Sequence, residues 1–376
     1  MLKNTLYVTS PDVYVGKQGE TIVVKKDKAI LGRVPLHNLE NVVLFNYVGM
    51  SPALLEECHG MGVSVAYLTP NGRLIGRFQG SSKGNILLRR VQYRISDDPE
   101  ASCNIARNMI LAKIYNQKWI MERYIRQYES RIDTKHLEIE SKQLGVFLSR
   151  VKECRSLDEL RGIEGIAQER YFSCFDEMIL NQKKEFIFGT RSRRPPMTRV
   201  NALLSFYYSV MGNDLASALE TVGLDSYAGF MHVDRPGRIS LALDMLEEFR
   251  GCVVDRFVLS LINQRIVNAK DFVIESSGAV VLTEMGRKKT LIKWRERKNE
   301  VITHPFLNEK IAWGLVPYVQ ANLLARYLRG DLDAYPPFFL EIKRSVCCVC
   351  FNYLRYLYRD RSGETALEAG GKSLCQ

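Results

Sequence analysis

The chain has 376 residues, of which 46% are hydrophobic and 25% charged, and its formal net charge is +11 at pH 7. This composition is that of a globular protein with two or three domains, and it excludes a disordered or fibrous chain. No apolar run approaches the roughly 18 residues of a membrane span, and the first residues alternate in hydropathy, unlike a signal peptide, so we expect a cytoplasmic protein with an anionic partner.

The first 95 residues have the pattern of short strands. Runs such as "TLYVTS", "ETIVVKK", "NVVLFNYVG" and "VSVAYL" are rich in β-branched and aromatic residues and are separated by turn residues. Ser51 and Pro52 fit the cap and the first position of one short helix. The pattern therefore predicts a small N-terminal β-rich domain over residues 1–95.

From residue 96 the period changes. Apolar residues recur every three or four positions in "NIARNMILAKIYNQKWIMERYIRQYESR", which is typical of amphipathic helices. Helical patterns continue to about residue 335, with a short strand-like interruption near "SSGAVVLTE". We predict an α+β protein with two domains, in which a larger, mostly α-helical catalytic domain spans 96–340. We expect residues 341–376 to be an atypical C-terminal tail.

Two carboxylates lie three residues apart in the run "SLALDMLEEFR", which reads as a helix with Ser240 at its cap. Asp244 and Glu247 would share one helical turn and repel each other unless a cation lies between them. A solvated acidic face is the alternative. His232 lies in the glycine-containing segment just before this helix, so a loop that folds back would bring its imidazole to the carboxylates. The helical period does not choose between Glu247 and its neighbour Glu248.

A third acid completes a candidate metal site. Glu164 lies between Gly162 and Gly165 at the predicted start of a helix, and these glycines permit close approach of a ligand. The alternative is an acid that only favours the positive end of that helix. One histidine and two or three carboxylates can hold a divalent ion. Mg²⁺ prefers oxygen ligands alone, so the imidazole nitrogen makes Mn²⁺ the more natural ion for this site. Three other histidines have no acid pair nearby: His37, His136 and His304.

Four blocks in this part of the chain carry a resemblance. They are "RGIEG…YF", "NALLSFYYSVM", "GLDSYAGFMH" and "SLALDMLEEFR". In this order and at roughly this spacing they resemble the CRISPR-associated integrase family, the first of the two universal spacer-acquisition proteins. The resemblance covers about residues 1–340, and "YPPF" at 335–338 is similar to members from subtype I-C systems. It implies a homodimer formed largely by the β-rich domains, and a small companion protein that bridges two dimers.

The resemblance also implies an activity and the residues that perform it. The activity is that of a metal-dependent DNA endonuclease and integrase, which inserts short foreign DNA segments into a CRISPR array during antiviral defence. Glu164, His232 and Glu247 match the ligands of a divalent Mg²⁺ or Mn²⁺ ion, and Asp244 matches a supporting acid. The resemblance alone selects Glu247 over Glu248. The alternative is a non-catalytic nucleic-acid-binding or scaffold protein, which the charge supports equally but which leaves the four blocks a coincidence.

Basic stretches are candidates for contact with DNA. Arg235 and Arg238 lie close to His232 in sequence and would hold phosphates without reading bases, unless they form an ordinary exposed loop. In the stretch 286–298, "GRKKTLIKWRERK", a solvated helix face is the alternative to DNA contact. Four residues of this stretch are predicted to contact phosphates: Arg287, Lys288, Lys289 and Lys293.

Two patterns in the tail do not support a further site. "GGKS" lacks the earlier glycine and the preceding strand of a phosphate-binding loop. Cys347, Cys348 and Cys350 do not form the two separated pairs expected of a zinc site. The other cysteines are scattered singly through apolar runs, so we expect reduced thiols.

Overall fold

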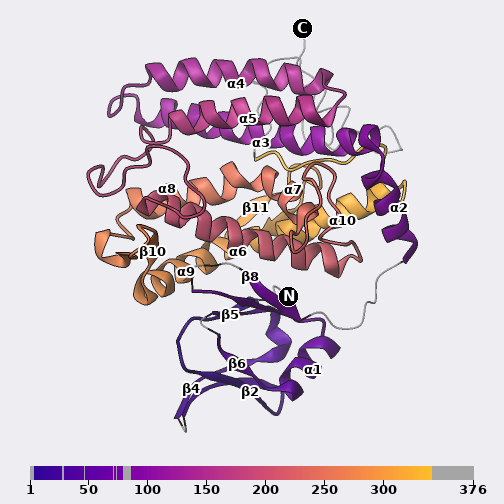
Figure 1. Ribbon diagram of the computed structural model, residues 1–376, viewed down its shortest axis with the longest axis vertical. Coiled ribbons are helices and arrows are strands. Elements are labelled where there is room, and N and C mark those ends of the chain that lie inside the picture. Colours follow the sequence, from indigo (N-terminus) through magenta and orange to yellow (C-terminus); the bar gives the residue numbers. More distant parts are fainter. Residues whose placement is uncertain are drawn as a thin grey trace.

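The computed structural model describes residues 4–27, 29–45, 47–70, 72, 74–78 and 86–340. The patterns noted in 341–376 lie outside this range. Figure 1 shows three layers: the β-rich N-terminal domain, a middle layer of helices, and an outer layer in which α3, α4 and α5 lie side by side. The predicted two-domain α+β fold is confirmed.

The N-terminal domain consists of two four-stranded sheets and one helix. In the first sheet the order is β1 (Asn4–Val8), β5 (Leu39–Phe45), β7 (Ser64–Leu68) and β8 (Leu74–Phe78). In the second sheet it is β4 (Ala29–Pro35), β3 (Thr21–Lys26), β2 (Tyr14–Gln18) and β6 (Gly49–Met50). The helix α1 (Pro52–Gly60) starts as predicted, because the Ser51 hydroxyl accepts the Leu54 N–H at 3.3 Å.

The second domain is helical, as predicted. Its outer layer contains α3 (Pro99–Tyr128), α4 (Lys135–Glu153) and α5 (Leu157–Ser173). Its longer helices are α2 (Ile86–Ser96), α6 (Arg199–Thr221), α7 (Ser240–Phe249), the π-helix η2 (Arg250–Asp255), α8 (Arg256–Asn263), α9 (Glu284–Asn299) and α10 (Val316–Leu328). The predicted interruption is a hairpin of β9 (Phe272–Ile274) and β10 (Val280–Leu282), and β11 (Val301–Thr303) pairs with β12 (Lys310–Ala312). Because α2 precedes residue 96, the helices begin earlier than the change of period suggested.

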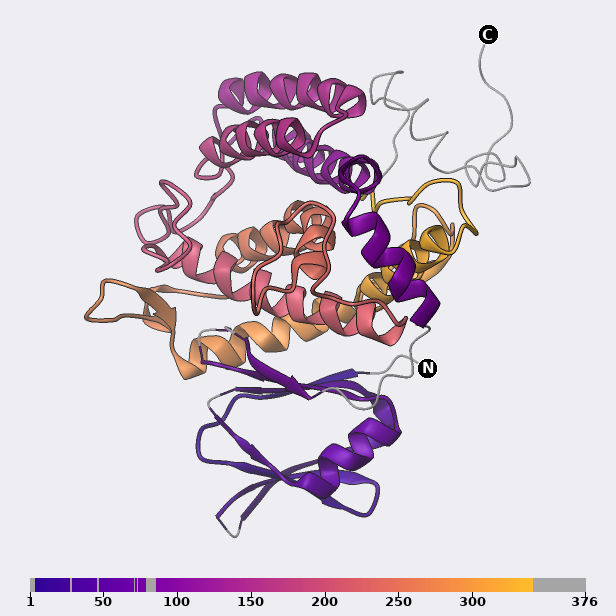
Figure 2. The same ribbon diagram turned by 45° about the vertical axis from the view of Figure 1, so that its right-hand side comes forward.

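The two domains are packed together through α9, which lies against the β-rich domain in both views (Figures 1 and 2). Phe45 and Leu68 belong to the same hydrophobic core as the helical domain. Arg287 of α9 is 3% exposed, and its Nη1 donates to the carbonyl of Pro70 at 3.0 Å while its guanidinium lies over Phe45. The prediction that Arg287 contacts DNA is therefore wrong, because this arginine is used inside the protein. Among the described helices, none is long and apolar enough to cross a membrane.

Candidate active site

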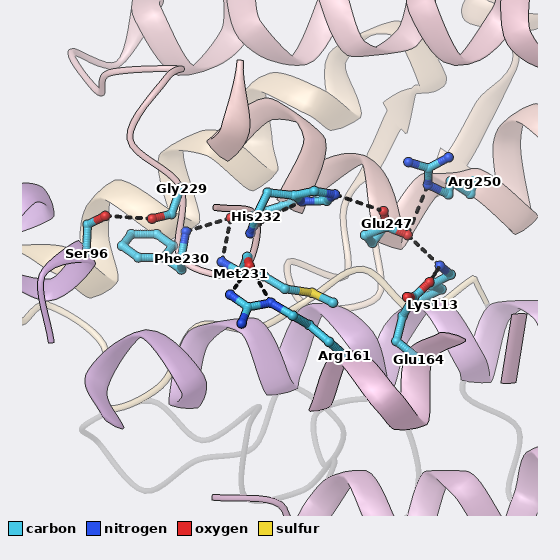
Figure 3. A network of polar contacts seen from close by, with 11 residues as sticks. Ser96, Lys113, Arg161, Glu164, Gly229, Phe230, Met231, His232, Glu247 and Arg250 are labelled. Carbon is cyan, nitrogen blue, oxygen red and sulfur yellow. Dashed lines mark hydrogen bonds and ion pairs between the residues drawn. The ribbon is translucent and has the colours of Figure 1, made fainter. Parts of the chain in front are cut away.

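The candidate site lies between the outer and middle helical layers (Figure 3). Glu164 comes from α5, Glu247 from α7, and His232 from the loop between α6 and α7. Glu164 lies in the middle of α5 and not at its start, because the hydroxyl of Ser156 caps that helix eight residues earlier. A Cβ added at Gly162 or Gly165 would meet no atom within 4 Å, so this side of α5 is open.

Asp244 fixes the loop that carries His232. Its Oδ2 accepts the backbone N–H groups of Phe230 and Met231 at 2.6 and 3.0 Å, and its Oδ1 accepts that of His232 at 3.0 Å. The same Oδ1 lies 2.5 Å from Nδ1 of His232. Because a carboxylate only accepts, Nδ1 carries the hydrogen and Nε2 is the nitrogen left for a ligand. This Asp–His pair is the arrangement that commonly orients a metal-binding imidazole.

Close packing and further hydrogen bonds hold the loop. A Cβ at Gly229 would lie 2.8 Å from Cβ of Ser240 and 2.9 Å from Oδ2 of Asp244, so only glycine fits without a shift. The guanidinium of Arg161 donates to the Met231 carbonyl at 2.6 and 3.1 Å. Ser240 is the first residue of α7 and not its cap, since its hydroxyl makes no cap hydrogen bond.

Glu247 is buried among positive charges. Lys113 Nζ lies 2.7 Å from its Oε2, and Arg250 Nε lies 3.0 Å from the same oxygen. His232 Nε2 lies 4.0 Å from its Oε1. Burial acts to raise the pKa of Glu247, but the charges of Arg250 and Lys113 outweigh burial and hold that pKa well below its ordinary value. Glu247 is therefore an ionised carboxylate.

Lys113 joins Glu164 to Glu247. This lysine is 1% exposed at its side chain, and its ammonium pairs with both carboxylates and with the amide oxygen of Gln168. The structure therefore brings His232 and Glu247 into direct proximity and connects Glu164 to them through Lys113. The repulsion expected between Asp244 and Glu247 is offset by groups of the protein itself.

Glu248 points away from this site. Its carboxylate accepts the hydroxyl of Tyr335 at 2.6 Å, the Phe338 N–H at 2.7 Å and the amide of Gln320 at 3.1 Å. Burial raises the pKa of Glu248 to about 7, although these hydrogen bonds act in the opposite direction. Of the two neighbouring glutamates, Glu247 faces the candidate site and Glu248 fastens the segment after α10.

The donor set fits a divalent cation. An imidazole nitrogen and a carboxylate oxygen 4.0 Å apart can share an ion whose bonds are about 2.0–2.2 Å long. Glu164 and Glu247 already surround one cation, the ammonium of Lys113. An ion held by Glu164, His232 and Glu247 would compete with this ammonium for the carboxylates.

Comparison with known proteins identifies the family. The family model described as CRISPR associated protein Cas1 matches residues 6–296. CRISPR-associated endonuclease Cas1 1 of Chlorobaculum tepidum is 48% identical over 335 residues, which cover 89% of this chain and 98% of that relative. The chain belongs to the Cas1 family. CRISPR-associated endonuclease Cas1 2 of Rhodospirillum rubrum is 44% identical, over 90% of this chain and 98% of that relative.

Solved structures agree with the Cas1 fold. A CAS1 protein from Thermotoga maritima has a TM-score of 0.73 at 22% identity, with 91% of this chain and all of that chain covered. A casposase bound to its integration product has a TM-score of 0.75 at 21% identity, over 96% of this chain and all of that chain. These likenesses establish the fold, and the relatives above establish that the chain is a CRISPR-associated endonuclease.

The predicted basic residues of this Cas1 chain lie in different environments. Arg235 is exposed beside the His232 loop, and burial together with the charges of Arg235 and Arg194 lowers the pKa of the half-buried Arg238. On α9, Lys288 is exposed and Lys289 pairs with Asp271 at 3.1 Å. Lys293 pairs with Glu296 at 2.7 Å on the same helix. Arginines thus gather beside the candidate site, whereas the lysines of α9 lie elsewhere.

One cluster contradicts an expectation about the other histidines of this Cas1 chain. His136 was expected to have no acid pair, but its Nδ1 lies 2.7 Å from Glu177 and its Nε2 lies 3.9 Å from Glu140. The sulfur of Cys174 lies 3.7 Å from the same Nδ1. The acids come from α4 and from the turn after α5. His304 is buried and bonds to Gln320, and burial lowers its pKa to about 4.

Several residues around the site were missed by sequence reasoning. The most important are Lys113, Arg161, Gly229 and Arg250. A lysine inside the otherwise apolar run "MILAKIY" was an available signal, because a buried lysine needs an anionic partner. Arg250 lies one turn after Glu247 and was detectable by the same helical spacing that paired Asp244 with Glu247.

Proposed function

We propose that this Cas1 chain inserts short DNA segments into a CRISPR array by strand transfer at the site formed by Glu164, His232 and Glu247. The observation that carries the proposal is the orientation of His232, whose Nδ1 is fixed by Asp244 and whose Nε2 faces the ionised Glu247. These three residues would hold Mg²⁺ or Mn²⁺, and Asp244 would act as the supporting acid.

In the reaction the 3′-hydroxyl of the incoming strand attacks phosphorus at the repeat boundary. The attacking hydroxyl gives up its proton to solvent as its oxygen bonds to phosphorus, the bond to the 3′-oxygen of the repeat strand breaks, and the departing oxygen takes a proton from solvent. A bound divalent ion would polarise the phosphoryl group and stabilise the departing oxygen. Asp244 keeps His232 in one tautomer and orientation, and Arg250 keeps Glu247 ionised and in place. Arg235 and Arg238 would hold the backbone phosphates beside the reacting bond.

We further propose the partners of this chain. The casposase structure contains an integration product, and another similar structure is a Cas6-RT-Cas1–Cas2 complex with a TM-score of 0.77 at 21% identity, in which the matched part covers 36% of that chain. By analogy, this chain would bind DNA and a small companion protein that bridges two homodimers. Two apolar side chains of the edge strand β4 support a dimer through the β-rich domain: those of Ile30 and Leu31, which are 45% and 55% exposed. We assign the chain to subtype I-C on the "YPPF" ending, and place it in the cytoplasm with its DNA.

Replacing His232 with Ala tests this function. We expect loss of strand transfer and of cleavage in Mn²⁺, with DNA affinity in EDTA unchanged, because dispersed cations supply most of the affinity. The matched control is His136→Ala, which removes a histidine paired with Glu177 outside the site. A wild-type chain that bound DNA and cut it neither in Mn²⁺ nor in Mg²⁺ would be a scaffold. A variant that lost binding as well would make His232 structural.

A further inference from the structure

A second charged feature of the helical domain lies away from the active site. A cavity of about 470 Å³ is bounded by the C-terminal half of α3, by α8 and by α9. Five cationic side chains and two carboxylates line it, which leaves three positive charges. We call it the arginine pocket after the four arginines that line it: Arg123, Arg131, Arg256 and Arg297.

Both carboxylates of the pocket are already paired. Glu296 pairs with Lys293, and Glu300 pairs with Arg297. In the part of the chain that the structure describes, three lining guanidinium groups have no carboxylate within ion-pair distance: those of Arg123, Arg131 and Arg256. The protein therefore leaves positive charge facing the cavity.

Two of these guanidinium groups share one aromatic partner. Arg123 and Arg256 lie over the same indole, with their central carbons 5.7 and 5.4 Å from the ring centroid of Trp119. Burial, followed by the charges of Arg297 and Arg123, lowers the pKa of Arg256 to about 10. Arg256 still carries its charge at neutral pH, so the folded protein bears this repulsion. An external anion in the pocket, close to both arginines, would relieve it.

The lining indicates the class of anion. The planar guanidinium donates two parallel N–H groups, which match the oxygens of a phosphate. Tyr124 and Tyr128 also line the pocket, with ring centroids 5.2 Å apart, and aromatic rings of this kind stack on nucleobases. We propose that the arginine pocket binds a nucleotide phosphate, supplied by the DNA strand beyond the reacting phosphodiester. This proposal rests on the proposed strand-transfer function.

Two helical paths lead from the active site to the pocket. Lys113 and Arg123 both belong to α3, and Glu247 and Arg256 are joined by the continuous run of α7, η2 and α8. At 1.5 Å per residue, each path is roughly 15 Å long. In duplex DNA, with a rise of 3.4 Å per nucleotide, this is about four or five nucleotides. A DNA arm of that length would reach from the reacting phosphate to the pocket.

The test compares two DNA lengths in EDTA, where no strand transfer occurs. One branched DNA carries an arm of about ten nucleotides beyond the reacting phosphate, and the other arm is trimmed to two. With the long arm, R123Q/R256Q should reduce the slope of log affinity against log salt by about 0.9, since both arginines hold one phosphate and each lost phosphate contact removes roughly 0.9. Between 50 and 200 mM salt the variant should therefore lose about three- to fourfold less affinity than the wild type. With the short arm, the two proteins should agree.

The control R126Q/R295Q removes the same charge from exposed positions of α3 and α9 outside the lining, and should keep the wild-type dependence on arm length. R123K/R256K keeps both charges without the planar fork, so it should keep the wild-type slope but bind the long arm more weakly than the wild type does, with no difference on the short arm. This loss tests the proposal if the glutamine variant does not fold. Equal slopes for wild type and R123Q/R256Q on the long arm would overturn the proposal. A second outcome would also overturn it: deoxyadenosine monophosphate raises the Tm of the wild type but not of R123Q/R256Q, and DNA binding does not depend on arm length. The pocket would then bind a free nucleotide and not a DNA strand. DNA binding is measured in EDTA, so this test does not depend on strand transfer. If the long arm bound the pocket but the protein showed no strand transfer with a divalent ion, only the proposed function would be refuted.

Discussion

Replacing Lys113 with Met should destabilise the protein in the absence of divalent ions. The ammonium of this 1% exposed side chain pairs with Glu164 and Glu247, which are 21% and 5% exposed. Removing one partner of a buried ion pair costs about 3–5 kcal/mol, because it leaves a buried charge without compensation. Arg250 still pairs with Glu247, and Glu164 still contacts solvent, so we expect about 3 kcal/mol. Urea unfolding in EDTA measures this loss of unfolding free energy.

The control for this variant is Lys118→Met on the same helix. Lys118 is 19% exposed and pairs with Glu122 one turn away, so its loss should cost at most about 1 kcal/mol. Adding Mn²⁺ should stabilise K113M more than the wild type, because in the wild type the ammonium competes for the same carboxylates. Equal unfolding midpoints for the two variants in EDTA would mean that Lys113 does not compensate the buried carboxylates. Equal stabilisation by Mn²⁺ in K113M and wild type would refute the competition.

Substitutions at Gly229, Glu248 and Arg287 test particular contacts, with Gly162 and Lys288 as comparisons. Gly229→Ala should lower the unfolding free energy by about 1–3 kcal/mol and slow strand transfer, since its Cβ would press on Asp244, whereas Gly162→Ala, which meets no atom within 4 Å, should not destabilise. Burial raises the pKa of Glu248 to about 7 from 4.5, so the folded state keeps a proton that the unfolded chain has released between these values. Stability therefore falls as pH rises through that window, by up to about 3 kcal/mol, and Glu248→Gln should reduce this fall in urea unfolding at pH 5 and 7.5. Arg287→Ala should lower the Tm without changing the salt dependence of DNA binding, and a flatter slope of log affinity against log salt would contradict this. Lys288→Ala should reduce that slope by about 0.9 if the exposed lysine contacts a phosphate.

The strands and caps of the N-terminal domain were predictable because their signals are local. The run "ETIVVKK" became β3, and Ser51 followed by Pro52 started α1, since alternation and capping depend only on neighbouring residues. The role of Arg287 was not predictable in this way. A basic stretch has the same composition whether its residues face solvent or another domain, and only the packing of α9 against the β-rich domain separates Arg287 from Lys288.

The candidate site was likewise predictable only where the signal is local. The helical period placed Asp244 and Glu247 on one turn, but it could not choose between Glu247 and Glu248, which are adjacent and both buried. The choice depends on what covers each carboxylate: Lys113 from α3 in one case and Tyr335 after α10 in the other. These partners lie 134 and 87 residues away in the chain, and no local pattern reports them.

Charge is distributed unevenly between the two regions that would act on DNA. Three carboxylates and two paired cations, Lys113 and Arg250, lie directly around His232, while Arg235 and Arg238 lie beside them. The carboxylates would repel the reacting phosphodiester unless a divalent ion were present, whereas the arginine pocket, with three excess positive charges about 15 Å away, would attract the same strand without one. Affinity and chemistry would then depend on different groups. Removing the ion should abolish strand transfer and leave most of the binding, while neutralising the pocket should weaken binding and leave the ion site intact.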